Sequence, residues 1–139
     1  MRYRGGRAAA TQRTHKGAKL PDVSAARANA MMSDAAASDD SDLRNITHAG
    51  TPLTAASLAI AEGTDATGLD VLAAIVLGYE TSGRISASIT PGFRKRGFHA
   101  CTIAIFSGTV ATARLLKLDA EKMTHAIALA ATSIGGLVA

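Results

Sequence analysis

Apolar residues recur every three or four positions in five stretches of the chain, which is the spacing of one face of an α-helix. The predicted helices begin at Asp22 or Ser24, at Thr51, at Thr67 or Gly68, at His99 or Ala100, and at Asp119. They end in the acidic stretch 38–42, at Gly63, near Ser88, at Leu116 and before Gly135. The pattern therefore predicts an all-α fold, an antiparallel helical bundle. In the first helix we expect Met and Ala side chains, Met31 and Met32 among them, to be buried.

The predicted helix ends carry local signals. Thr51 can cap the second helix, with Pro52 in its first turn, where the N–H that proline lacks would have no partner. Asp70 lies in the first turn of the third helix, and Asp119 can cap the fifth.

The composition agrees with close helix packing. Alanine accounts for 30 of the 139 residues, whereas Phe and Tyr together number five. Ala costs no side-chain entropy in a helix, and small side chains let neighbouring helices approach closely. We expect one helical domain over residues 21–139, preceded by a basic loop or extended segment over residues 1–20. The apolar residues 137–139 lead us to expect that the chain is a piece of a longer protein.

The charge of the chain limits the class of partner. The formal net charge is +4, but the first 20 residues hold six basic side chains and no acidic one, which leaves the remainder slightly acidic. Only this basic segment favours a nucleic-acid-binding module, so we expect no nucleic-acid partner. A single cysteine forms no internal disulfide, and no apolar run approaches the roughly 18 residues of a membrane span. We expect a cytoplasmic protein without a membrane partner.

Charged residues and histidines gather before two predicted helix starts. Asp39 and Asp40 shortly precede His48, which lies just before the helix start at Thr51. Unpaired N–H groups at a helix start suit an anionic ligand, and an imidazole there can act as an acid or base. His99 has the same placement before the fourth helix. These residues predict an acid/base site for an anionic substrate; the alternative is that they are solvated caps and hydrogen-bonded turn residues.

The other histidines and the cysteine suggest no second site. The four histidines show no i, i+4 pairing, so we expect no metal site. We expect His125 at the edge of the core and Cys101 as a small buried hydrophobic residue.

Several short motifs occur in an order that resembles the MmgE/PrpD family. They are Ala28-Asn29-Ala30, Asp39-Asp40-Ser41, Thr47-His48-Ala49-Gly50-Thr51-Pro52, Ala59-Ile60-Ala61-Glu62, Gly78-Tyr79-Glu80 with Arg84, Gly97-Phe98-His99, and Leu115-Leu116-Lys117-Leu118-Asp119. The resemblance runs over about residues 17–139. None of these motifs is specific alone, but their joint order and spacing are. The family includes 2-methylcitrate dehydratase, cis-aconitate decarboxylase and iminodisuccinate epimerase.

The resemblance implies a particular kind of enzyme. Family members combine a large helical domain with a smaller α+β lid, use neither a metal nor another cofactor, and are usually homodimers. This chain is similar to an internal part of the helical domain and lacks the lid. The implied function is that of a lyase, close to 2-methylcitrate dehydratase, acting on a citrate-like di- or tricarboxylic acid.

The resemblance also implies roles for individual residues. His48 and His99 match the family's active-site imidazoles, and one would take a proton while the other assists loss of hydroxide. Asp39 and Asp40 match the last two acids of an Asp-Phe-Asp-Asp-Thr-like motif and are carried over as catalytic residues. Ser41 stands where that motif has Thr.

The resemblance also implies substrate-binding residues, and it reveals one substitution at a position where the family has an acid. Ser41 and Arg96 are expected to bind the substrate carboxylates. Ala37 stands where the family has its first Asp, the acid expected to face the substrate, and a methyl group transfers no proton. The alternative function is therefore a truncated, inactive remnant or an assembly subunit of such an enzyme.

Overall fold

The computed structural model of the protein describes residues 10–11, 19–37, 39–90 and 92–136. Its α-helices are α1 (Asp22–Ala35), α2 (Gly50–Glu62), α3 (Gly68–Ile89), α4 (Gly92–Lys95), α5 (Ala104–Leu115) and α6 (Ala120–Thr132), with a 3₁₀ helix, η1 (Ala100–Ile103), before α5. Strands β1 (Ala10–Thr11) and β2 (Lys19–Leu20) form a short antiparallel pair. The prediction of an all-α fold is confirmed. Most of the predicted basic segment 1–20 lies outside the described residues.

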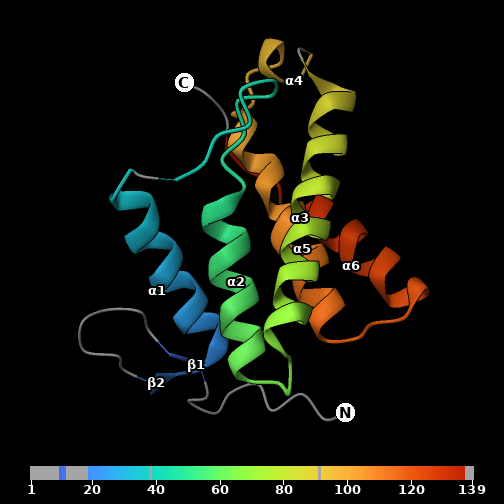
Figure 1. Ribbon diagram of the computed structural model, residues 1–139. Helices are drawn as coiled ribbons and strands as arrows, with labels where there is room; N and C mark the ends of the chain where they lie inside the picture. Colours follow the sequence, from blue (N-terminus) through green and yellow to red (C-terminus); the bar gives the residue numbers. More distant parts are fainter. Residues whose placement is uncertain (1–9, 12–18, 38, 91, 137–139) are drawn as a thin grey trace.

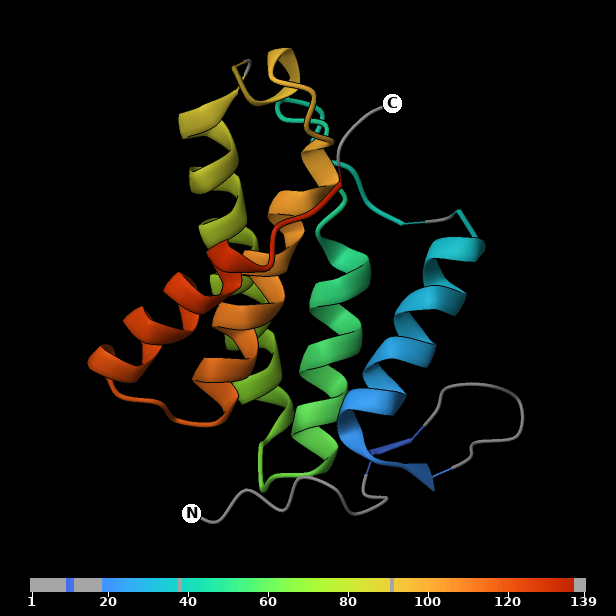
Figure 2. The same cartoon turned by 180° about the vertical axis from the view of Figure 1, so that it is seen from behind.

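Helices α1, α2, α3 and α5 lie side by side, and α6 crosses the far side of α5 (Figures 1 and 2). Helix α2 packs against α1, α3 and α5. The α1–α2 connection, α4 and η1 gather at one end of the bundle (Figure 1). In the described ranges, none of the helices is both long and apolar enough to cross a lipid bilayer.

Small residues allow α3 and α5 to pack closely. The buried cluster between α2, α3 and α5 comprises Leu53, Ile60, Ala74, Ala111 and Leu115. A Cβ added at Gly78 of α3 would collide with the Leu53 side chain and lie 2.8 Å from the carbonyl oxygen of Ser107 on α5. The α3–α5 contact therefore depends on the absence of a side chain at residue 78.

Most predicted helix ends are confirmed. The Thr67 hydroxyl accepts the Asp70 N–H and the Asp70 carboxylate accepts the Thr67 N–H, which is a complete capping box. The Asp119 carboxylate accepts the Lys122 N–H at the start of α6. Helix α2 ends at Glu62, and Gly63 follows it as predicted.

The prediction that Thr51 caps α2 is wrong. The helix begins one residue earlier, at Gly50. Its N-cap residue is Ala49, whose side chain makes no capping hydrogen bond. Instead Oδ1 of Asp40 accepts the Gly50 N–H at 2.9 Å. The carboxylate comes from ten residues earlier in the chain, so a local pattern does not reveal it.

Three predictions of burial also fail. Met31 is 62% exposed and Met32 36%, because the buried face of α1 is narrow and consists of Asp22, Ala25 and Asn29. The His125 side chain is 71% exposed and lies 3.9 Å from Glu121 on the outer face of α6.

Candidate functional site

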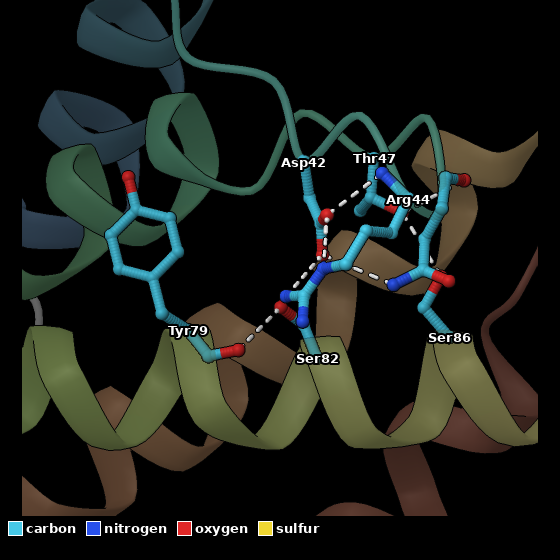
Figure 3. A network of polar contacts seen from close by, with 7 residues as sticks. Asp42, Arg44, Thr47, Tyr79, Ser82 and Ser86 are labelled. Carbon is cyan, nitrogen blue, oxygen red and sulfur yellow. Dashed lines mark hydrogen bonds and ion pairs between the residues drawn. The ribbon is translucent and has the colours of Figure 1, made fainter.

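The α1–α2 connection, which the structure describes over residues 36–37 and 39–49, owes its shape partly to one aspartate. Oδ1 of Asp42 accepts the Arg44 N–H at 3.0 Å, and Oδ2 accepts the Asn45 side-chain amide at 3.0 Å. The Arg44 guanidinium also bonds this carboxylate, with Nε 3.1 Å from Oδ1. These bonds with Arg44 hold the pKa of Asp42 below its ordinary value. Hydrogen bonds among its own residues therefore hold the connection in a turn (Figure 3).

A buried hydrogen bond fixes this turn to α3. The hydroxyls of Thr47 and Ser86 lie 3.1 Å apart, and both residues are buried. One turn earlier along α3, the Ser82 hydroxyl donates to the Tyr79 carbonyl oxygen at 3.3 Å (Figure 3). The residue after Thr47 is His48, so this bond anchors the backbone beside the predicted catalytic imidazole.

Asp40 is bonded by α2 and α3 together. It accepts the Gly50 N–H and a hydrogen bond from the Tyr79 hydroxyl. Burial, then this hydrogen bond and the charge of Asp40, raises the pKa of Tyr79 to about 12. A Cβ at Gly50 would collide with Oδ1 of Asp40 and lie 2.6 Å from the Tyr79 hydroxyl oxygen. A side chain at residue 50 would therefore displace the Asp40 carboxylate or the Tyr79 hydroxyl.

Asp39 pairs with His48. The Asp39 Oδ2 lies 3.1 Å from Nδ1 of the imidazole. The Asp39 side chain is 15% exposed and the His48 side chain 39%. A largely buried carboxylate thus meets one nitrogen of a ring that remains partly open to solvent.

The pair borders a pocket of about 480 Å³, which we call the His48 pocket. Its lining residues are Ala30, Met31, Asp34, Ala37, Asp39, His48, Thr51, Pro52, Cys101 and Ala104. They come from α1, the α1–α2 connection, the first turn of α2, η1 and the start of α5. The wall is mainly apolar, with a carboxylate–imidazole pair at its edge, an arrangement that can transfer a proton to or from a small molecule.

A second pocket of about 790 Å³, the Tyr79 pocket, lies between the α1–α2 connection and α3. Its lining residues are Asp40, Ser41, Asp42, Arg44, Asn45, Thr47, Ala49, Val76, Tyr79, Glu80, Ser82, Gly83, Arg84 and Ala87. Its charged groups bond one another: Arg44 bonds Asp42, and Arg84 bonds Glu80 with Nε 2.6 Å from Oε1.

The structure divides the predicted site residues among different places. Asp39 and His48 lie together in the His48 pocket, whereas Asp40 and Ser41 line the Tyr79 pocket. His99 and Arg96 are exposed and belong to the lining of neither pocket.

His99 is the N-cap residue of η1. Its Nδ1 accepts the Cys101 N–H at 3.2 Å, and its own N–H donates to the Gly136 carbonyl oxygen at 2.9 Å. The residue of this segment that reaches the His48 pocket is Cys101, two positions further on. His99 therefore lies close to the pocket in the chain without forming part of its wall.

Sequence reasoning missed three residues of these pockets. Cys101 is half-buried and lines the His48 pocket, so its interpretation as a buried hydrophobic residue is wrong. Tyr79 bonds Asp40 across the second pocket. Asp34 also lines the His48 pocket, and a signal for it existed: an acid in the last turn of a helix opposes the helix dipole. Within the described ranges, no three His, Cys, Asp or Glu side chains group closely enough to hold a metal ion.

Together the fold and the site define an all-helical domain that presents an aspartate–histidine pair to a pocket beside a helix start. The sequence matches the family model of the MmgE/PrpD N-terminal domain over residues 3–139, and the chain belongs to the MmgE/PrpD family. Comparison with curated proteins and comparison with solved structures found no match.

Proposed function

We propose that this protein is part of an MmgE/PrpD-type lyase that acts on a citrate-like di- or tricarboxylic acid, as 2-methylcitrate dehydratase does. The observation that carries the proposal is the Asp39–His48 pair at the edge of a pocket of about 480 Å³. Membership of the family supports the class of reaction.

The proposed reaction is the removal of water. His48 takes a proton from the carbon next to a substrate carboxylate, and the electrons of that C–H bond form the new double bond. The C–O bond on the neighbouring carbon breaks, and the hydroxide leaves as water with a proton from an acid. His99 has this second role in the proposal; it lies two residues before Cys101, which lines the pocket, while its own side chain is outside the pocket wall.

Binding of the substrate carboxylates is assigned to basic and hydroxyl groups near this end of the bundle. Arg96 follows α4 and is exposed, so its guanidinium is accessible to a substrate carboxylate. Ser41 precedes the Asp42 turn and lines the Tyr79 pocket. Asp40 has a positioning role in this proposal, because its carboxylate bonds Gly50 and Tyr79.

The test is turnover of 2-methylcitrate, citrate and related hydroxy acids, followed by the ultraviolet absorbance of the conjugated double bond. His48→Gln and His99→Gln should each lower kcat by about 10²- to 10⁴-fold, the usual contribution of a positioned acid or base. His125→Gln, a change of the same type on the exposed face of α6, should leave turnover unchanged. Wild-type rates in both the His48 and the His99 variants would refute the assignment.

The second candidate, an inactive remnant or assembly subunit, is favoured by Ala37. Its methyl group lines the His48 pocket with Asp39 and His48, and it supplies no proton there. This candidate predicts no turnover of any of these acids by the wild-type protein. Ala37→Asp would then be the variant to assay, because it places a carboxylate in the same pocket.

We also propose that the protein forms a homodimer, as the family resemblance implies. Leu69, Leu72 and Val76 follow one face of α3 and are exposed. Apolar side chains gathered on a surface favour association with a partner. Light scattering after size-exclusion chromatography should give twice the monomer mass, and Leu72→Glu should return the mass to that of one chain.

A further inference from the structure

The two predicted catalytic imidazoles receive opposite hydrogen bonds at the same ring atom. Nδ1 of His48 faces a carboxylate oxygen of Asp39, whereas Nδ1 of His99 faces the backbone N–H of Cys101. An ionised carboxylate only accepts hydrogen bonds, and a backbone N–H only donates them. The two partners therefore demand different proton positions on the two rings.

For His48 the consequence is a hydrogen on Nδ1. The Asp39 carboxylate accepts this N–H at 3.1 Å, so the neutral ring keeps its lone pair on Nε2. For His99 the lone pair is on Nδ1, where it accepts the Cys101 N–H, and the neutral ring carries its hydrogen on Nε2.

We infer that Asp39 is a positioning residue that makes Nε2 of His48 the proton acceptor, while the Cys101 N–H makes Nε2 of His99 a hydrogen-bond donor. The inference rests on the proposed function, and it assigns the two roles that family membership leaves open. His48 accepts the substrate proton, and His99 has an N–H on Nε2, the kind of group that its role in the proposed function requires. In this assignment Asp39 itself exchanges no proton with the substrate.

The environment of Asp39 suits this role. Its side chain is largely buried, and a buried carboxylate needs a hydrogen-bond partner. His48 is the more exposed member, with 39% of its side chain open to solvent and its residue on the wall of the His48 pocket. A carboxylate that fixes the tautomer of a catalytic histidine is worth about 10⁴-fold in kcat in serine proteases, where its loss leaves the wrong tautomer.

The tautomers can be measured without any turnover. Long-range proton–nitrogen NMR correlation of ¹⁵N-histidine-labelled protein, at a pH at which the rings are neutral, distinguishes the nitrogen that carries hydrogen from the one that carries the lone pair. His→Gln variants assign the signals. We expect the wild-type protein to show hydrogen on Nδ1 of His48 and on Nε2 of His99. Hydrogen on Nε2 of His48 in the folded wild-type protein would overturn the inference, whether or not any variant folds.

Substitution then tests whether Asp39 sets the tautomer of His48. Asp39→Ala should shift His48 towards the tautomer mixture of free histidine, whereas Asp34→Ala, which removes another carboxylate from the same pocket, should leave its spectrum unchanged. A His48 spectrum unchanged in Asp39→Ala would contradict the inference. In the enzyme assay, Asp39→Ala should lower kcat by up to about 10⁴-fold and change KM little. If the spectra agree but no acid is turned over, the inferred tautomers stand and the proposed function fails.

Discussion

The two pockets that border the α1–α2 connection differ in size and in the bonding of their charged groups. In the larger Tyr79 pocket, Arg44 bonds Asp42 and Arg84 bonds Glu80. In the smaller His48 pocket, Asp39 bonds one nitrogen of the His48 ring, which has a second nitrogen on its far side. Volume alone would favour the Tyr79 pocket, but the chemistry favours the His48 pocket.

The difference separates structural from reactive polar groups. Charged groups that are already paired stabilise a turn or a helix face. A ligand can bind such a group only by displacing its existing partner. A paired imidazole is different, because the carboxylate that bonds Nδ1 leaves the lone pair of the neutral ring on Nε2, where a ligand can use it. Three substitutions, two of them with a matched control, test the contacts that shape the two pockets.

The largest effect on stability should come from Gly50→Ala, at the start of α2 between Asp40 and Tyr79. The added methyl group would collide with the Asp40 carboxylate, so the long-range cap of α2 would have to move. We expect the free energy of unfolding to fall by about 1–3 kcal/mol, the usual cost of overpacking. Urea denaturation measures this change.

The matched control is Gly83→Ala, in α3 on the wall of the Tyr79 pocket. A Cβ there meets no atom within 4 Å, and Ala is the better helix former, so the protein should become about 0.5–1 kcal/mol more stable. Equal effects of the two substitutions would show that Asp40 does not hold the start of α2.

A smaller effect is expected at Ala37, on the wall of the His48 pocket. Its φ of 49° lies in the left-handed region, which costs an L-residue with a Cβ about 1–2 kcal/mol. Ala37→Gly should therefore raise the free energy of unfolding by about 1 kcal/mol, as measured by denaturation. Ala36→Gly, at the neighbouring residue with a φ of −73°, should lower it instead. A fall in both variants would argue against strain at residue 37.

The smallest effect should appear only in alkaline solution and belongs to the Tyr79 pocket. The native pKa of Tyr79, about 12, is above the value of about 10 for tyrosine in an unfolded chain. Between these values the native state binds more protons, so the stability that this hydroxyl contributes is complete below pH of about 10 and is lost as the pH rises through about 12. Tyr79→Phe should flatten the dependence of unfolding free energy on pH in this range. Parallel curves for the two proteins would contradict the raised native pKa of Tyr79.

The features predicted correctly from the sequence are those encoded within a few residues. The start of α3 at Gly68 with Asp70 in its first turn, the Asp119 cap of α6 and the stop of α2 at Gly63 each depend on neighbours in the chain. The abundance of alanine likewise indicated helices that approach closely, as α3 and α5 do at Gly78.

The candidate site was predicted only in part, because its geometry depends on partners distant in the chain. Asp39 and His48 were recognised and do pair. Asp40 was grouped with them, but its bonds are to Gly50 and to Tyr79 of α3, 39 residues further on. Met31 looked like a core residue from its type, yet it is exposed beside the His48 pocket, since composition does not reveal which face of α1 meets α2.

The adjacent carboxylates of Asp39 and Asp40 connect the His48 pocket to the start of α2. Asp39 bonds the His48 imidazole, and Asp40 bonds the N–H of Gly50, the first residue of α2. Because a single peptide bond links Asp39 and Asp40, any ligand that displaced the His48–Asp39 pair would also disturb the Asp40 bond at the start of α2.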